Sequence, residues 1–269
     1  VDPLYVGYEP IMQALNVDIK TVLAHPQHGF EPQLDDLIAA VSDKTRVIFI
    51  NTPGNPTGAI IAAETLRDLA AFCQQRDIWL VCDEVYSMFT YEKMHVSLRT
   101  TAKSLDNIVV IDGLSKSHAM SGWRVGWVVA PPELTRHLGN FSAMSTFGNP
   151  QFIQDAAAFA LNNDEYYVRE MRDKYRRRRD LVCERLAQMT PLKFLRPEAG
   201  MFVMVDVSAV YADDKEFAQR LLDAESVSVL PGSAFGKGCS GHVRLSLVQP
   251  EEVLMKGCDR LQRFIDSIN

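Results

Sequence analysis

The chain has 269 residues, 47% of them hydrophobic, so it is long enough to bury one large core and a smaller second one. Its formal net charge of −6 argues against a nucleic-acid-binding or membrane-surface role, because both need clustered basic surface. No apolar run reaches the ~20 residues that cross a bilayer. The scattered cysteines lack CxxC spacing and the histidines lack HxxxH spacing. We therefore expect a protein of the reducing cytoplasm, with no metal site.

The first two thirds of the chain alternate predicted strands and helices. Short apolar runs bounded by turn residues indicate buried strands, and longer stretches with helical spacing indicate amphipathic helices. This alternation predicts βαβ units and a mostly parallel sheet. Strands are expected at 17–24, 46–51, 78–82, 108–111 and 124–130, and helices within 1–16 and at 34–41, 63–76, 133–145 and 150–161.

A long charged helix is expected at residues 164–189, about 26 residues and so ~39 Å long. After it, strands at 201–207, 227–230 and 242–248 combine with helices at 214–224 and 251–265. This mixture predicts a small α+β domain, whose glycine-rich turn at 231–241 we expect to be mobile. We therefore expect a large domain at 1–170 and a small domain at 171–269, joined by the long helix.

Polar residues follow the carboxyl ends of three successive predicted strands. Asn55 lies in the loop NTPGNPTG, Asp83 ends an apolar strand, and Ser115 and Lys116 follow the next one. Ligands of open α/β sheets bind at such strand ends, so we expect these residues to meet at one rim. Each residue alone also has an ordinary explanation, as a turn residue, a surface carboxylate or a surface lysine.

Lys116 has no acidic neighbour before the next strand. A buried lysine without a partner escapes the cost of its charge through a lowered pKa, and can then act as a nucleophile, a Schiff-base former or a general base. Arg124 follows among glycines, in GWRVG, where the backbone can come close to a fixed anion such as a phosphate.

The stretch LSKSHAMSGWRVGW, with NPTG and DEVY before it, resembles the motifs of class I and II aminotransferases, which are fold-type I enzymes that use pyridoxal 5'-phosphate (PLP). The resemblance implies an α/β fold with a mostly parallel sheet between helices, plus the small α+β domain. It implies that Lys116 holds PLP as a Schiff base, that Ser115 and Arg124 bind its phosphate, and that Asp83 pairs with the pyridine nitrogen.

The same resemblance assigns four further residues. Tyr86 and Asn55 would hydrogen-bond the 3'-oxygen of the cofactor, and Tyr5 would stack on its ring. Arg244, in the predicted strand HVRLSLV, would pair with the substrate α-carboxylate, near Asn55. An exposed strand arginine and a packing tyrosine remain the alternatives for Arg244 and Tyr5.

The implied activity is transfer of an amino group from an L-amino acid to a 2-oxo acid such as pyruvate, by a ping-pong mechanism in a cytoplasmic homodimer. The stretches SKSHAMSGWRVGWVV and YRRRRDLV look especially like arginine:pyruvate transaminases, which suggests arginine as the donor. A PLP-dependent C–S β-lyase shares the same residues, and an inactive, truncated PLP-binding module stays open. A nicotinamide-dependent enzyme fits poorly, because no GxGxxG follows a strand.

Members of this family carry a further segment before the point that corresponds to Val1. The resemblance therefore implies a large domain without its N-terminal strands. We expect one absent strand to lie between two that are present, which would leave sheet edges unpaired.

Overall fold

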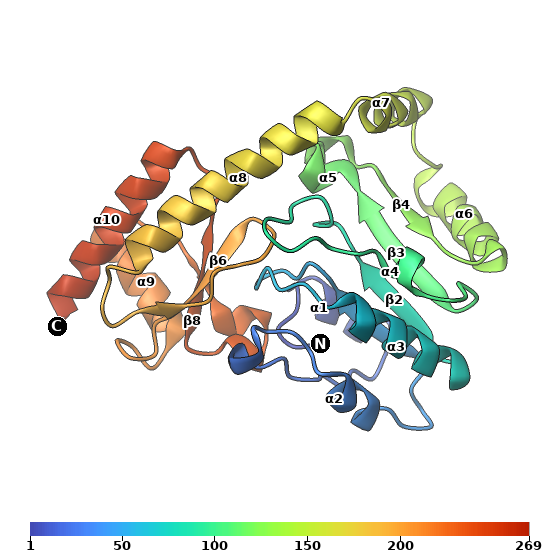
Figure 1. Cartoon of the computed structure of the whole chain (residues 1–269), viewed down its shortest axis with the longest axis horizontal. Helices are drawn as coiled ribbons and strands as arrows, with labels where there is room; N and C mark the ends of the chain where they lie inside the picture. The colour runs from blue at the N-terminus through green and yellow to red at the C-terminus, as the bar shows by residue number, and fades with distance from the viewer. Residues whose placement is uncertain (269) are drawn as a thin grey trace. The chain divides into compact units, whose positions relative to one another are not determined.

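The computed structural model describes residues 1–268 (Figure 1). The chain forms two compact units: unit 1 comprises Val1–Pro32, Gly54–Ala59 and Asp173–Asn269, and unit 2 comprises Gln33–Pro53 and Ile60–Arg172. The boundary after Arg172 lies near the expected division at 170/171, whereas the first 32 residues and Gly54–Ala59 pack with the C-terminal part of the chain. The identity of the two expected domains as a PLP-binding and a small domain stays a prediction.

Unit 2 is built on a four-stranded sheet in the order β1-β2-β3-β4. The first three strands are parallel and β4 is antiparallel to β3, which confirms a mostly parallel sheet. All four strands pair consecutively; the expectation that an absent strand lies between two present ones in the family's full sheet stays a prediction. Strands that follow one another along the chain usually lie side by side. Their bounds are β1 (Val47–Asn51), β2 (Trp79–Asp83), β3 (Ile108–Gly113) and β4 (Gly126–Val129).

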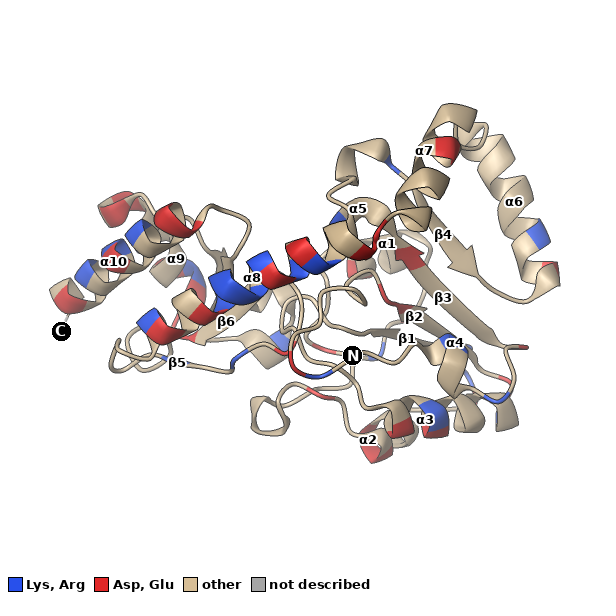
Figure 2. Ribbon diagram, turned by 45° about the horizontal axis from the view of Figure 1, so that its top comes forward, with Lys and Arg blue, Asp and Glu red and all other residues tan. Residues whose placement is uncertain are grey.

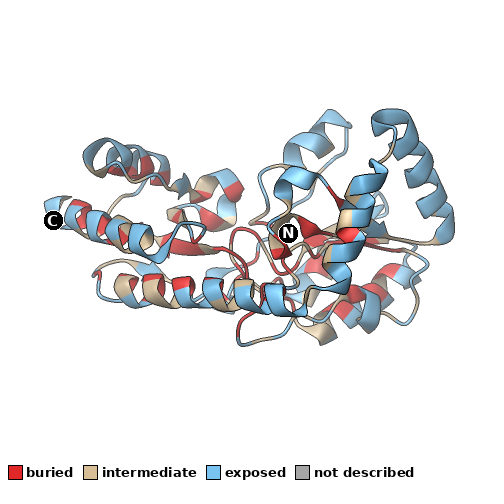
Figure 3. Cartoon of the chain, turned by 90° about the horizontal axis from the view of Figure 1, so that it is seen from above, coloured by how far each residue is buried: buried red, intermediate tan, exposed pale blue. Residues whose placement is uncertain are grey.

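Helices accompany this sheet, and the best packed of them is α3 (Ala63–Gln75). It buries Leu66, Leu69, Ala70 and Cys73, the spacing that places apolar side chains on one helix face. In contrast, α6 (Pro132–Thr146) has no buried residue and is exposed along its length (Figure 3). The other helical segments are α2 (Leu34–Ala39), α4 (Leu98–Thr101), α5 (Leu114–Ser117), η2 (Ser121–Trp123) and α7 (Gln151–Asn162).

Unit 1 contains an antiparallel sheet in the order β5-β6-β8-β7, covered by helices whose buried residues recur every three or four positions. The strand expected at 17–24 is wrong: among the described residues only the bridge between Asp2 and Leu23 forms there. Because no strand pairs with the segment beyond that bridge, its alternating apolar side chains Val17 and Leu23 stay exposed. The strands are β5 (Lys193–Phe194), β6 (Phe202–Asp206), β7 (Leu230–Pro231) and β8 (His242–Ser246). The helical segments are α1 (Tyr8–Ala14), η1 (Pro26–His28), α9 (Asp214–Glu225), η3 (Gly232–Phe235), η4 (Lys237–Cys239) and α10 (Glu251–Ile268).

The long helix α8 (Glu165–Leu186) carries the chain from unit 2 into unit 1. Basic and acidic residues alternate along it (Figure 2). The basic run at 174–179 is not a wholly solvated face, because Arg178 and Arg179 are buried; Arg178 donates to the carbonyls of Leu247 and Val248, and Arg179 pairs with Asp180. Within residues 1–268, no helix combines the length and apolar character needed to span a bilayer.

Candidate active site

The carboxyl ends of β1, β2 and β3 lie next to one another because these strands pair in that order. Asp83 is the last residue of β2 and is half-buried. Its backbone carbonyl accepts hydrogen bonds from Asn51 Nδ2 at 2.9 Å and from the N–H of Thr52 at 3.0 Å. Its Oδ1 accepts from the N–H of Val85 at 3.0 Å, which fixes the turn that follows. The end of β1 thus holds the backbone of Asp83 in place.

Lys116 lies on α5, which begins directly after β3. The side chain is half-buried, and its Nζ is 5.8 Å from the ring centroid of Tyr86, in the loop after β2. Among residues 1–268, no carboxylate lies within ion-pair distance of this amine. Ser115 precedes it on the same short helix and is also half-buried. The amine and the phenol ring therefore face one another across two neighbouring strand ends.

Arg124 lies two residues before β4 rather than inside a strand, so that part of the expectation for 124–130 is wrong. It adopts a left-handed conformation with φ of 55° and closes the turn η2. Its Nη1 donates to the carbonyl of Ser121 at 2.8 Å, and the side chain is otherwise exposed. After this turn, Gly126 approaches β3 so closely that a Cβ there would lie 2.8 Å from the Asp112 carbonyl oxygen, which explains the glycine at this position.

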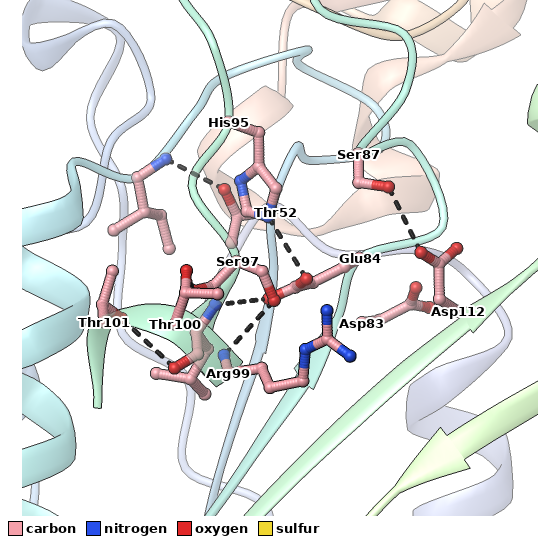
Figure 4. Close-up of polar contacts among 12 residues, drawn as sticks. Thr52, Asp83, Glu84, Ser87, His95, Ser97, Arg99, Thr100, Thr101 and Asp112 are labelled. Carbon is pink, nitrogen blue, oxygen red and sulfur yellow. Dashed lines mark hydrogen bonds and ion pairs between the residues drawn. The ribbon is translucent and has the colours of Figure 1, made fainter. Parts of the chain in front are cut away.

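A second carboxylate at the same rim was not predicted. Asp112, near the end of β3, accepts from the N–H of Gly113 at 2.7 Å and from Ser87 Oγ at 3.2 Å (Figure 4). Burial, together with the smaller effect of the charges of Glu84 and Asp83, raises the pKa of Asp112 to about 6, although its two hydrogen bonds act to lower it. The sequence did hold a signal, since Asp112 ends an apolar strand as Asp83 does.

Glu84 anchors the loop that leads from the rim to α4. It is 2% exposed, accepts from the N–H of Leu98 at 2.8 Å, and lies 3.4 Å from His95 Nε2 (Figure 4). Burial alone would raise the pKa of Glu84, but hydrogen bonds from His95, Ser97 and Leu98 together hold it below its ordinary value. This buried network supports the turn after Asp83 from below the rim.

Unit 1 brings together Asn55 and Arg244, the two residues expected to meet a substrate carboxylate. Arg244, on β8, donates from Nη1 to Asn55 Oδ1 at 2.8 Å. Its guanidinium carbon lies 3.9 Å from the ring centroid of Phe202 and 4.7 Å from that of Phe235. Both distances suit cation–π contacts, which orient a planar guanidinium. Sequence reasoning had not identified either phenylalanine.

Tyr5 also belongs to unit 1 and is 43% exposed. Its ring contacts the edge of the Tyr8 ring, with centroids 5.3 Å apart. The predicted site residues thus divide between the units: Tyr5, Asn55 and Arg244 in unit 1, and Asp83, Tyr86, Ser115, Lys116 and Arg124 in unit 2.

The unit 2 residues fit a planar cofactor that carries a phosphate. The unpaired amine of Lys116 can bond an aldehyde, the half-buried carboxylate of Asp83 can bind a protonated ring nitrogen, and the exposed guanidinium of Arg124 can bind a phosphate. Residues 1–268 contain no cluster of three or more histidine, cysteine, aspartate or glutamate side chains that could hold a metal ion.

Comparisons with known proteins show which family the chain resembles. An arginine–pyruvate transaminase from Pseudomonas aeruginosa is 43% identical over 260 residues, covering 97% of this chain and 66% of the relative. An aspartate/prephenate aminotransferase from Thermus thermophilus is 34% identical, covering 98% and 68%. The chain therefore spans about two thirds of the length of these relatives.

The solved structure of an aromatic aminotransferase from Pyrococcus horikoshii superposes with a TM-score of 0.94 at 33% identity, over 99% of this chain and 72% of that one. This similarity confirms the expected α/β fold. The family model for aminotransferase class I and II matches residues 1–261. The chain therefore belongs to the class I and II aminotransferase family.

Proposed function

We propose that this protein is a PLP-dependent aminotransferase that moves an amino group from an L-amino acid to a 2-oxo acid such as pyruvate, by a ping-pong mechanism. The class I and II aminotransferases depend on PLP, and the residues at the rim of unit 2 fit that cofactor. One observation carries the proposal: the Lys116 amine is half-buried, has no carboxylate partner within residues 1–268, and lies 5.8 Å from the Tyr86 ring.

Each rim residue has a role in this proposal. Lys116 would hold the cofactor and, once freed by the substrate, would move the proton that leaves the substrate α-carbon. When bound, PLP supplies the electron sink for that proton transfer. Asp83 would keep the pyridine nitrogen protonated, and Ser115 and Arg124 would bind the phosphate.

The remaining predicted residues orient the reactants. Tyr86 and Asn55 would donate hydrogen bonds to the 3'-oxygen, and Tyr5 would stack on the ring. Arg244 would bind the substrate α-carboxylate through its guanidinium fork, next to Asn55, with which it shares a hydrogen bond.

The amino donor that we propose is arginine. The support is the 43% identity with an arginine–pyruvate transaminase, together with the resemblance of the stretches SKSHAMSGWRVGWVV and YRRRRDLV to such enzymes. No acidic pair for a substrate guanidinium is evident from the sequence, so this part of the proposal depends on the donor assay below.

We also propose a homodimer in the cytoplasm, with unit 2 providing most of the PLP-binding domain and the C-terminal part of unit 1 the small domain. Exposed aromatic residues on α6 and α7, among them Phe141, Phe152 and Phe159, support a partner surface. All five cysteines are free, as is usual in a reducing compartment.

Borohydride trapping tests the proposal. Purified protein is incubated with PLP, reduced with borohydride and digested, and the modified peptide is identified by mass spectrometry. We expect the cofactor on Lys116, and loss of the yellow absorbance and of the label in Lys116→Ala. The matched control is Lys256→Ala, which removes an exposed lysine paired with Glu252 on α10. Cofactor fixed elsewhere, or no cofactor bound, would overturn the proposal.

A donor panel then separates the possible activities. Arginine with pyruvate should give alanine, and product formation should require the 2-oxo acid. Pyruvate and ammonia from cystathionine, without an acceptor, would instead indicate a β-lyase. Cofactor bound on Lys116 without turnover of any donor would indicate an inactive binding module.

A further inference from the structure

Two buried carboxylates hold the segment 231–241, here called the Phe235 loop. Asp2, which is 5% exposed, accepts from the N–H of Lys237 at 3.0 Å with Oδ2 and from the N–H of Gly238 at 2.9 Å with Oδ1. Asp214, which is 3% exposed, accepts from the N–H and the Oγ of Ser233, at 3.0 and 2.6 Å, and from the N–H of Gly241 at 2.9 Å. The loop is thus fixed at both ends and in its middle.

Asp2 is itself held firmly, although it lies 235 residues from Lys237. Its N–H donates to the Val22 carbonyl at 2.8 Å, and its carbonyl accepts from the N–H of Ala24 at 2.7 Å. The Asp2 carboxylate also fits against Gly236, whose φ of +121° and lack of a Cβ permit this approach. The Asp2 carboxylate is therefore fixed in position, and the backbone at Gly236 has the conformation that allows it to approach.

The Phe235 loop contacts Arg244, the residue to which we assign binding of the substrate carboxylate. Phe235 is 1% exposed, and the centroid of its ring lies 4.7 Å from the Arg244 guanidinium carbon. The backbone carbonyl of Phe235 accepts a hydrogen bond from the N–H of Leu4 at 2.8 Å. Phe202 and Asn55 contact the same guanidinium. An arginine side chain has many rotamers, and these contacts restrict it before any ligand arrives.

We propose that Asp2 is a positioning residue for Arg244: by holding the Phe235 loop, it keeps the Phe235 ring against the guanidinium and so preorganises Arg244 for a substrate carboxylate. Asp2 touches neither substrate nor cofactor in this role. The inference rests on the proposed function, in which Arg244 binds the substrate α-carboxylate.

Three variants of the PLP-loaded protein test the inference. Asp2→Asn replaces one acceptor oxygen by an NH2 group that faces a backbone N–H, so the loop should loosen. Phe235→Leu keeps the loop hydrogen bonds but removes the ring. Asp213→Asn is the control, because Asp213 caps α9 with its exposed side chain and asparagine caps a helix equally well.

Two measurements are combined for each variant. Hydrogen exchange at the amides of residues 237 and 238 reports whether the loop is held. The inhibition constant of propionate, a carboxylate that cannot donate an amino group, and the KM of the amino donor report carboxylate binding. Asp2→Asn should lose amide protection and raise both constants about 10-fold, with kcat nearly unchanged. Phe235→Leu should raise both constants while the amides stay protected, and Asp213→Asn should change nothing.

The outcomes separate the inference from the proposed function. If Asp2→Asn and Phe235→Leu leave both constants unchanged while Arg244→Lys raises them, Asp2 has a purely structural role and the inference is overturned. If Arg244→Lys also leaves them unchanged, the assignment of Arg244 itself is wrong. Should Asp2→Asn fail to fold, Asp2→Glu takes its place in both measurements, because it keeps the charge but moves the carboxylate away from the N–H groups of Lys237 and Gly238.

Discussion

The Nζ of Lys116 lies 5.8 Å from the ring centroid of Tyr86; Tyr86 lies in the loop after β2, and Lys116 lies on α5, directly after the neighbouring parallel strand β3. This relationship brings an amine and a phenol to one rim without any direct sequence proximity. Tyr86 is also a good position at which to test the cofactor assignment. Its ring is almost fully buried, and a phenylalanine ring would fill the same space.

Tyr86→Phe should keep the packing of the ring and lose only the hydroxyl. If that hydroxyl donates to the 3'-oxygen of PLP, its loss should raise the dissociation constant of PLP about 10-fold, the value of one hydrogen bond to a charged acceptor. Spectrophotometric titration of the cofactor-free protein with PLP measures this. Tyr91→Phe, at another buried tyrosine outside the proposed site, is the control. Equal PLP affinity in wild type and Tyr86→Phe would remove Tyr86 from the site.

Asp112→Asn should stabilise the protein at neutral pH. The pKa of Asp112 is raised from 3.8 to about 6 in the folded state, so the folded protein binds its proton more tightly than the unfolded chain. Stability contributed by the protonated form is present below pH 3.8 and is lost as the pH rises through 6. At pH 7 the ionised carboxylate therefore costs on the order of 2–3 kcal/mol, which asparagine would avoid.

Urea unfolding at pH 4, 5, 6 and 7 would measure this effect. The stability difference between Asp112→Asn and wild type should grow across that range and level off above pH 7. Asp106→Asn, at an exposed aspartate just before β3, should show no such trend. A constant difference between variant and wild type from pH 4 to 7 would contradict the raised pKa.

Glu84→Gln should have the opposite pH dependence. The pKa of Glu84 is lowered below 4.5 because the hydrogen bonds from His95, Ser97 and Leu98 outweigh its burial. The stability that this carboxylate contributes is present above pH 4.5 and is lost as the pH falls through the lowered value. Glutamine should therefore cost about 2 kcal/mol at pH 7 and much less at pH 3.5. Thermal unfolding of Glu84→Gln and wild type at both pH values measures this difference, and Glu64→Gln, at an exposed glutamate, is the control. If Glu84→Gln lost the same stability at pH 3.5 as at pH 7, the hydrogen bonds to an ionised Glu84 carboxylate would be excluded.

Much of unit 2 was predictable, because its signals are local. The strands end in turn residues and the helix α3 has regular apolar spacing, so the order of elements and the polar residues at the strand ends follow from short stretches of sequence. Asp112 carries the same kind of signal as Asp83 but was not singled out. The roles of these residues toward PLP stay predictions.

The features that were missed depend on contacts between distant segments. The GWRVG stretch has the composition of a strand, yet Arg124 takes a left-handed conformation in the turn before β4, and Gly126 lies close against the Asp112 carbonyl of β3. Asp2 and Lys237 meet from opposite ends of the chain, and no local pattern encodes that pairing. No local pattern distinguishes Phe202 and Phe235 from ordinary core residues either. Only their distances from the Arg244 guanidinium show that they contact it.

Glycine substitutions give a final, graded test of the loop that carries Asn55. Gly58 is buried with φ of +71°, and a Cβ there would overlap the Ala199 carbonyl oxygen and lie 2.7 Å from Pro197 Cβ. Gly58→Ala should therefore destabilise the protein by about 3 kcal/mol or more. Because the loop that contains Asn55 would have to shift, the KM of the amino donor should also rise.

Two other glycines separate the backbone effect from the steric one. Gly29 has a similar φ of +65° but open space around it, so Gly29→Ala should cost only about 1 kcal/mol. Gly257, in the middle of α10, has neither constraint, and Gly257→Ala should stabilise by about 0.5–1 kcal/mol because alanine favours the helix. Urea unfolding of the three variants should give the order Gly257→Ala, wild type, Gly29→Ala, Gly58→Ala. If Gly58→Ala were no worse than Gly29→Ala, the close packing of residues 54–59 against Pro197 and Ala199 would be wrong, and with it the fixed position of Asn55 beside Arg244.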